Sequence, residues 1–162
     1  MDYEYLFNKQ RELDSYIEDN LESVNRDDLF RKKILALQVE IGELANETRC
    51  FKFWSRKGPS EQSIILEEYV DGLHFILSVG LDKGLTYTSS PLTDNGIDQT
   101  DSFLALYRSI VAFYSEPVQE TYVTLFQNFL QLGQQLGFNE ASILKAYQQK
   151  NEVNHTRQDE GY

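Results

Sequence analysis

One segment of the chain, at residues 63–81, reads SIILEEYVDGLHFILSVGL and is apolar almost all the way round, yet it carries acidic side chains. Such a pattern is typical of a helix in a protein core. Glu68 and Asp71 stand three positions apart, so a helix places both carboxylates on one face. Burial of bare charge is costly unless the charge is paired or binds a metal, and the segment contains no Lys or Arg. It therefore predicts a core helix whose acids hold divalent cations.

A second acidic pair, Glu40 and Glu43 in the sequence EIGE, has the same spacing. It lies in a segment whose apolar residues recur with a helical period, and the two glutamates flank that apolar stripe. Taken alone, the pair could be a solvated acidic edge. If the two helices pack antiparallel, all four carboxylates converge on one cleft. Oxygen-only ligation then favours Mg²⁺, with Mn²⁺ as a possible substitute.

The rest of the chain also shows helix patterns, without strand-like alternation of convincing length. Ser60, Asp98 and Asn139 are well placed as N-caps of later helices. The expected helices cover roughly residues 3–23, 27–49, 61–84, 98–115, 117–137 and 140 onwards. Helices of this length with short connections predict an all-α bundle of about five to six helices. We expect one domain over residues 1–162, with a flexible tail at 158–162.

Charge and cysteine content restrict the partners of this chain. Its 15 basic and 26 acidic residues give a net charge of −11, which makes nucleic acid a poor partner. An anionic substrate would also be repelled unless cations bridge it to the protein. Cys50 is the only cysteine, so no intrachain disulfide can form. Without a leader-like N-terminus or an apolar run of membrane-spanning length, we expect a cytoplasmic protein with no membrane partner.

Several polar and aromatic residues outside the acidic pairs are candidate ligand-binding groups. Gln10 and Asp14 lie beside the apolar stripe of the first helix and could bind a pyrimidine edge or form an internal polar network. Trp54, the only tryptophan, could stack on a base or fill the core. His74 follows Asp71 by three residues and would lie beside the metal carboxylates, although a satisfied core histidine is the more common case.

The C-terminal segment carries two cations and an amide at helical spacing, namely Lys150, Asn154 and Arg157. If this segment is helical, the three side chains share one face and could clasp an anion. The alternative is a frayed, solvated terminus.

These motifs run from one end of the chain to the other: Gln10-Arg-Glu-Leu-Asp14, Glu40-x-x-Glu43, Phe53-Trp54, Glu68-x-x-Asp71-x-x-His74 and Lys150-x-x-x-Asn154-x-x-Arg157-Gln158-x-x-Gly161-Tyr162. The set resembles the dimeric all-α dUTPases of the MazG-like nucleoside triphosphate pyrophosphohydrolase superfamily. This resemblance implies Mg²⁺-dependent hydrolysis of dUTP to dUMP and pyrophosphate, by attack of water at the α-phosphorus. It also implies a homodimer whose sites involve both subunits.

The resemblance further assigns roles to matched positions. The metal ligands would be Glu40, Glu43, Glu68 and Asp71. Glu43, with Glu40 as the close second choice, would orient or deprotonate the attacking water. The base and sugar would be bound by Gln10, Trp54 and His74, and Asp14 is a further candidate for binding the substrate. The groups that close over the phosphates would be Lys150, Asn154 and Arg157.

Three other functions compete with this one. The same acids could serve a pyrophosphohydrolase that prefers another nucleotide, such as dCTP or a modified triphosphate. A ferritin-like di-iron protein would use Asp71-x-x-His74 and Glu152-x-x-His155, but the second motif lies in a polar terminus without an apolar face. A non-enzymatic helical module would bind a basic partner through its acidic face.

Overall fold

In the computed structural model, which describes residues 1–162, the chain forms six α-helices and no strand. The helices are α1 (Tyr3–Asp19), α2 (Arg26–Thr48), α3 (Gln62–Asp82), α4 (Gln99–Ser115), α5 (Gln119–Gln135) and α6 (Glu140–Asp159). The prediction of an all-α bundle of five to six helices is confirmed. No helix combines the length and the apolar character that crossing a membrane requires.

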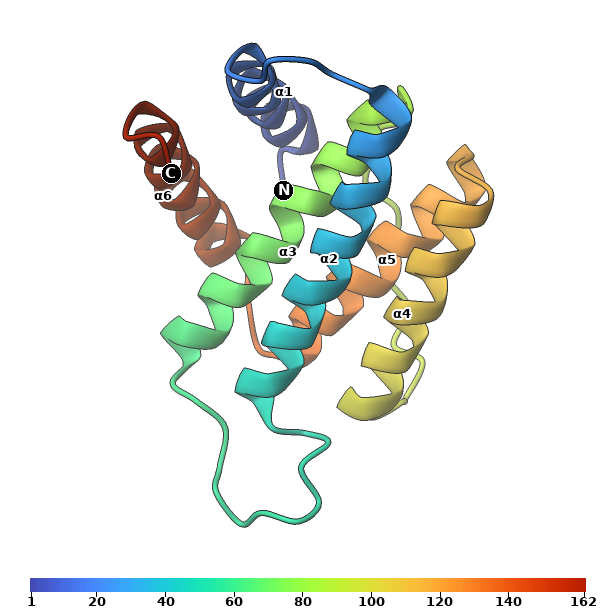
Figure 1. The fold of residues 1–162 in the computed structure, drawn as a ribbon. Coiled ribbons are helices and arrows are strands. Elements are labelled where there is room, and N and C mark those ends of the chain that lie inside the picture. The colour runs from blue at the N-terminus through green and yellow to red at the C-terminus, as the bar shows by residue number, and fades with distance from the viewer.

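The central helix is α3, which runs antiparallel to α2 through the middle of the molecule (Figure 1). Helices α1 and α6 pack on one side of this pair, whereas α4 and α5 form a second pair on the other side. The central place follows from the sequence of α3, because Val70, Leu73 and Leu77 are each no more than 1% exposed. Burial of apolar area on all sides of one helix is the main force that gathers the others around it.

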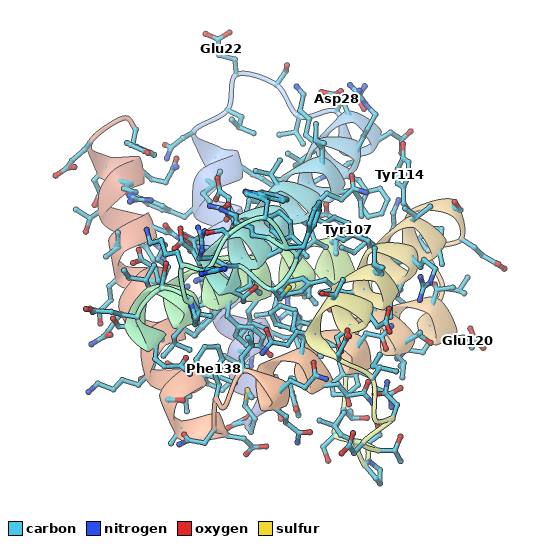
Figure 2. All side chains as sticks on the ribbon, turned by 90° about the horizontal axis from the view of Figure 1, so that it is seen from below. Glu22, Asp28, Tyr107, Tyr114, Glu120 and Phe138 are labelled. Atoms are coloured by element: carbon cyan, nitrogen blue, oxygen red, sulfur yellow. The ribbon has the colours of Figure 1, made fainter.

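Close approach between α3 and α5 depends on a glycine. The ring of Tyr69 stacks on Phe129 with centroids 4.2 Å apart, and its hydroxyl donates to the Phe129 carbonyl at 3.1 Å. A Cβ on Gly133 would lie only 2.4 Å from the Tyr69 hydroxyl oxygen, so no larger residue fits there without displacement of the ring. On α4, the Tyr107 hydroxyl donates to the Gln38 carbonyl at 3.0 Å and ties α4 to α2; Figure 2 labels this residue between the two helices.

Some helix ends have the caps and bounds that the sequence predicted, and others do not. Asp98 and Asn139 cap α4 and α6 with side-chain hydrogen bonds, as predicted. The predicted cap at Ser60 is wrong: Glu61 precedes α3 without a side-chain bond, and the Ser60 hydroxyl donates to Glu47 instead. The first helix ends at Asp19 rather than Ser23. After Asp19 the chain turns more tightly: the Asn20 N–H donates to the Ile17 carbonyl at 3.2 Å and the Leu21 N–H to the Glu18 carbonyl at 3.0 Å, which satisfies these terminal carbonyls.

Candidate functional site

A pocket of about 460 Å³ is lined mainly by α1, α2, α3 and α6, a volume in the range of small-molecule sites. Its walls include most of the polar residues that the sequence singled out, from Gln10 on α1 to Arg157 on α6. Acidic groups line one part of the pocket, and a hydrogen-bonded network lines another. The long-range packing of α1 and α6 against α3 brings these groups together.

Gln10 is the centre of the network and is only 3% exposed. Its amide nitrogen donates to Asp14 Oδ1 at 2.8 Å, because the two residues are one helical turn apart on α1. Its amide oxygen accepts from the Tyr147 hydroxyl at 3.0 Å and lies 2.7 Å from Nδ1 of His74. Ser78 of α3 donates to the other oxygen of Asp14 at 2.8 Å. The internal polar network, one of the two interpretations of Gln10 and Asp14, is thus present, and both residues also line the pocket.

His74 is a buried histidine that lacks one hydrogen-bond partner. Its ring stacks on Tyr147 with centroids 4.3 Å apart, and its Nε2 atom has no partner. Burial, together with the positive charge of Lys150, lowers the pKa of His74 to about 3, so the ring is neutral near pH 7. With Nδ1 beside the Gln10 oxygen, which can only accept, the neutral ring carries its proton on Nδ1. Nε2 is therefore a free acceptor in a residue that lines the pocket.

Three carboxylates from two helices converge near this network. Oxygens of Glu40 on α2 and of Glu68 and Asp71 on α3 all lie within 4.8 Å of one another. Burial raises the pKa of Glu40 to about 7, and the negative charges of Asp71, Glu43 and Glu68 add to that effect. Like charges held this close are stabilised by a divalent cation, and an all-oxygen donor set suits Mg²⁺. The residues present therefore fit the metal that the sequence predicted.

Glu43 differs from these three acids in its surroundings. It is exposed and stands one turn after Glu40, outside the group whose oxygens converge. Its charge still contributes to the raised pKa of both Glu40 and Glu68. The structure thus places all four predicted acids in one neighbourhood, with Glu43 at its solvent side.

A lysine from α6 supplies part of the compensation that α3 lacks. Lys150 Nζ lies 2.9 Å from Asp71 and 3.2 Å from Glu67. Burial still raises the pKa of Asp71 above its usual range, although Lys150 opposes that shift. One positive charge does not balance the four carboxylates. The negative charge that remains uncompensated supports the expectation of a cation at this position.

The C-terminal segment is helical rather than frayed, because α6 continues to Asp159. Lys150, Asn154 and Arg157 all line the pocket, as their shared helical face predicted. The Arg157 guanidinium lies 4.9 Å from the ring centroid of Tyr162, which also lines the pocket. The chain thus closes one side of the pocket with cationic and amide groups.

Trp54 lies away from this group, on the connection between α2 and α3. Its side chain is 65% exposed, which excludes the core-filling interpretation. It makes edge-to-face contacts with Phe51 and Phe53 and is not among the residues that line the pocket. The structure does not bring Trp54 to Gln10 and His74.

Sequence reasoning missed Lys33 and Ser78, which line the pocket, and Tyr147, a fully buried residue of the network whose hydroxyl donates to Gln10. Tyr147 shares a face of α6 with the buried Ile143 and Asn151 at four-residue spacing, a signal that was available. Ser78 is a small polar residue in an apolar helix, and such residues need partners. Lys33 lies on the apolar side of α2, and its place there is explained only by the carboxylates of α1 and α3 that pack around it.

Comparison with protein families gives a match over residues 2–162, essentially the whole chain, to the family described as dUTPase. No individual curated protein matches the chain. The match agrees with the family that the sequence motifs resemble.

Proposed function

The chain belongs to the dUTPase family and is a dUTP diphosphatase, and we propose that it cleaves dUTP to dUMP and pyrophosphate with Mg²⁺ as cofactor and as a homodimer. The observation that supports the metal dependence most strongly is the convergence of Glu40, Glu68 and Asp71 on one point. An acidic pocket repels a triphosphate unless cations lie between them, so the metal and the substrate are expected to occupy the site together.

When bound, Mg²⁺ would lower the pKa of a coordinated water and offset the charge that develops on the phosphoryl oxygens. Glu40, Glu43, Glu68 and Asp71 are its proposed ligands. Glu43 is our first choice, and Glu40 the second, for the group that orients the water and accepts its proton. The water would then attack the α-phosphorus in line with the bond that breaks. Glu43 is suited to this role because it is exposed and stands one turn after Glu40, at the solvent side of the converging oxygens, where water reaches it.

At the triphosphate end, Lys150, Asn154 and Arg157 would bind phosphate oxygens from the surface of α6. Arg157 offers a planar fork of donors, whereas Lys150 offers a mobile point charge. If a metal ion binds Asp71, Lys150 would leave its ion pair with that carboxylate and would pair with a phosphate oxygen instead. Closure of these groups would also exclude water from the reaction.

At the other end, Gln10, Asp14 and His74 would bind the base and sugar. A pocket that hydrogen-bonds a ligand group discriminates strongly against analogues that lack it, because its own polar atoms are then left unpaired. Trp54 would take part in base binding only if the connection at residues 49–61 closes over the pocket. It is therefore the assignment in this proposal that requires the largest rearrangement.

The direct test is release of pyrophosphate from each deoxynucleoside triphosphate, with Mg²⁺ and with a chelator. We expect dUTP to be the preferred substrate and the chelator to abolish turnover. The double variant Glu68→Ala/Asp71→Ala should lose turnover and also lose stabilisation of the fold by Mg²⁺. Glu152→Ala is the matched control, because this exposed acid on α6 lies outside the pocket.

Each competing function predicts a different result. Equal cleavage of dUTP and dCTP would contradict the choice of base but keep the metal site. Iron bound after aerobic purification, with loss of iron in Glu152→Ala, would favour a di-iron protein. A double variant that gains stability and keeps its activity would contradict the metal assignment altogether and favour an acidic interaction surface.

A further inference from the structure

Lys33 occupies the end of the pocket network and has no role in the chemistry described above. Its side chain is 11% exposed, and its Nζ atom lies 2.8 Å from Asp82, 4.0 Å from Asp14 and 3.9 Å from Glu18. These contacts join α2 to both α1 and α3 through one ammonium group. A lysine surrounded by three carboxylates from neighbouring helices is a fixed charge that acts on each of them.

We propose that Lys33 is a positioning residue that acts through Asp14 and Gln10 to keep the proton of His74 on Nδ1. It would thereby leave Nε2 as the acceptor that the pocket offers to a ligand. The proposal deepens the function proposed above and rests on it for the identity of the ligand. The arrangement of protons in the free protein does not depend on that function.

The first step is the charge of Asp14. Burial raises the pKa of this carboxyl, and the charge of Lys33 is the largest opposing effect. While Asp14 is ionised, both of its oxygens can only accept hydrogen bonds. They accept from Gln10 and from Ser78, each at 2.8 Å.

The second step is the orientation of the Gln10 amide. Because Asp14 accepts only, the nitrogen of Gln10 must face it, and the oxygen must face the other way. That oxygen lies 3.0 Å from the Tyr147 hydroxyl and 2.7 Å from His74 Nδ1. A protonated Asp14 would instead offer a donor, and the amide would gain by turning over.

The third step is the tautomer of His74. An amide oxygen opposite Nδ1 requires a proton on Nδ1, whereas an amide nitrogen there would require the proton on Nε2. His74 is 5% exposed, and its Nε2 has no partner in the protein. An unpaired buried acceptor is costly, so a ligand N–H or O–H, such as a base imide or a sugar hydroxyl, is its natural partner.

The first experiment observes the tautomer directly by long-range ¹⁵N–¹H correlation of the histidine rings in protein free of metal and nucleotide. The chain has only two histidines, so His155→Gln assigns the signals of His74 by elimination. We expect the neutral Nδ1–H form. Observation of the Nε2–H form, or of a mixture of both, would overturn the proposal, whether or not the enzyme cleaves dUTP.

The second experiment removes the charge. Lys33→Met should move His74 to the Nε2–H form, and Lys33→Arg should keep the wild-type form. For dUTP cleavage, Lys33→Met should raise KM about tenfold, the effect of losing about one hydrogen bond, and leave kcat nearly unchanged. Lys145→Met, an exposed lysine on α6, is the matched control. An unchanged tautomer in a folded Lys33→Met protein, or a loss in kcat at constant KM, would refute the role of Lys33.

Loss of Lys33 leaves several carboxylates unpaired, so Lys33→Met/Glu18→Gln provides a second variant in which one of them is neutral. Asp82 is left unchanged, because its charge raises the pKa of Asp14 and its removal would offset the loss of Lys33. The same change in tautomer and the same rise in KM are expected in it, and a wild-type tautomer there contradicts the proposal. If no nucleotide is cleaved by any variant or by the wild type, the proposed function fails, whereas the ring spectra still decide the role of Lys33.

Discussion

The imidazole of His74 is 5% exposed and stacks on Tyr147, and this environment disfavours its charged form. The same burial that lowers its pKa to about 3 keeps the ring available as a neutral hydrogen-bonding group. Glu40 illustrates the opposite case, because burial and neighbouring carboxylates raise its pKa to about 7. At the scale of single residues, the pocket therefore holds one group that resists protonation and another that resists ionisation.

The low pKa of His74 predicts how stability depends on pH. In the unfolded chain the ring has a pKa of 6.5, so below that value the unfolded state binds a proton that the native state does not. The contribution of His74 is complete above pH 6.5 and is lost as the pH falls toward 3, by at most about 1.4 kcal/mol per pH unit. Urea unfolding of the metal-free protein between pH 7.5 and 5 measures this loss.

His74→Asn is the control, since an amide can replace the Nδ1–H donor but does not titrate. We expect the variant to be less stable than the wild type at pH 7.5, because it loses the stacking on Tyr147. The difference should shrink as the pH falls, while the acidic groups contribute equally to both proteins. A constant difference across this range would show that native His74 takes up its proton as readily as the unfolded chain does, which contradicts the lowered pKa.

At the scale of helices, the sequence predicted the features whose residues lie within a single helix and missed those that depend on packing between helices. The pattern of α3 and the pairs of acids at three-residue spacing are visible within one helix, so the sequence predicted both. The contact between Lys150 and Asp71 joins residues on two helices far apart in the chain, and only packing brings them together. The exposed position of Trp54 likewise depends on how a connection folds, which helix periodicity does not encode.

Helix α6 holds Lys150, a cation that would compete with the proposed metal for Asp71. Lys150→Gln removes the positive charge 2.9 Å from that carboxylate. We expect Mn²⁺ to bind the nucleotide-free variant about three- to tenfold more tightly than the wild type, because a like charge next to the site is gone. The KM for dUTP should rise, because the same lysine is proposed to bind phosphate.

Isothermal titration with Mn²⁺ measures the first effect without any reaction. Lys145→Gln on the same helix is the matched control, since this lysine is exposed and does not line the pocket. Equal or weaker Mn²⁺ binding by Lys150→Gln would show that Lys150 does not compete with the cation.

At the scale of the whole molecule, exposed apolar side chains gather where α2 meets α4. Leu35, Val111 and Tyr114 are 62%, 52% and 45% exposed, and they share one shallow groove. Figure 2 labels Tyr114 at this edge of the molecule. Exposed apolar patches often mark surfaces that another protein covers, and a homodimer requires such a surface on each copy. Among the faces of this bundle, the groove between α2 and α4 is the one we expect a second copy to cover.

Leu35→Glu tests this expectation. A carboxylate buried at a dimer interface is costly, and the nearby Arg31 of the groove is already paired with Asp28, so the variant should dissociate into monomers at concentrations at which the wild type is dimeric. Leu35 lies on the outer face of α2 and is not a pocket residue, so the circular dichroism of the monomer should match that of the wild type. Val153→Glu is the matched control, because this side chain on α6 is 44% exposed and lies outside the groove. Sedimentation velocity distinguishes the outcomes: a Leu35→Glu protein that sediments as the wild-type dimer would place the interface on another face, and a wild-type monomer would contradict the homodimer itself.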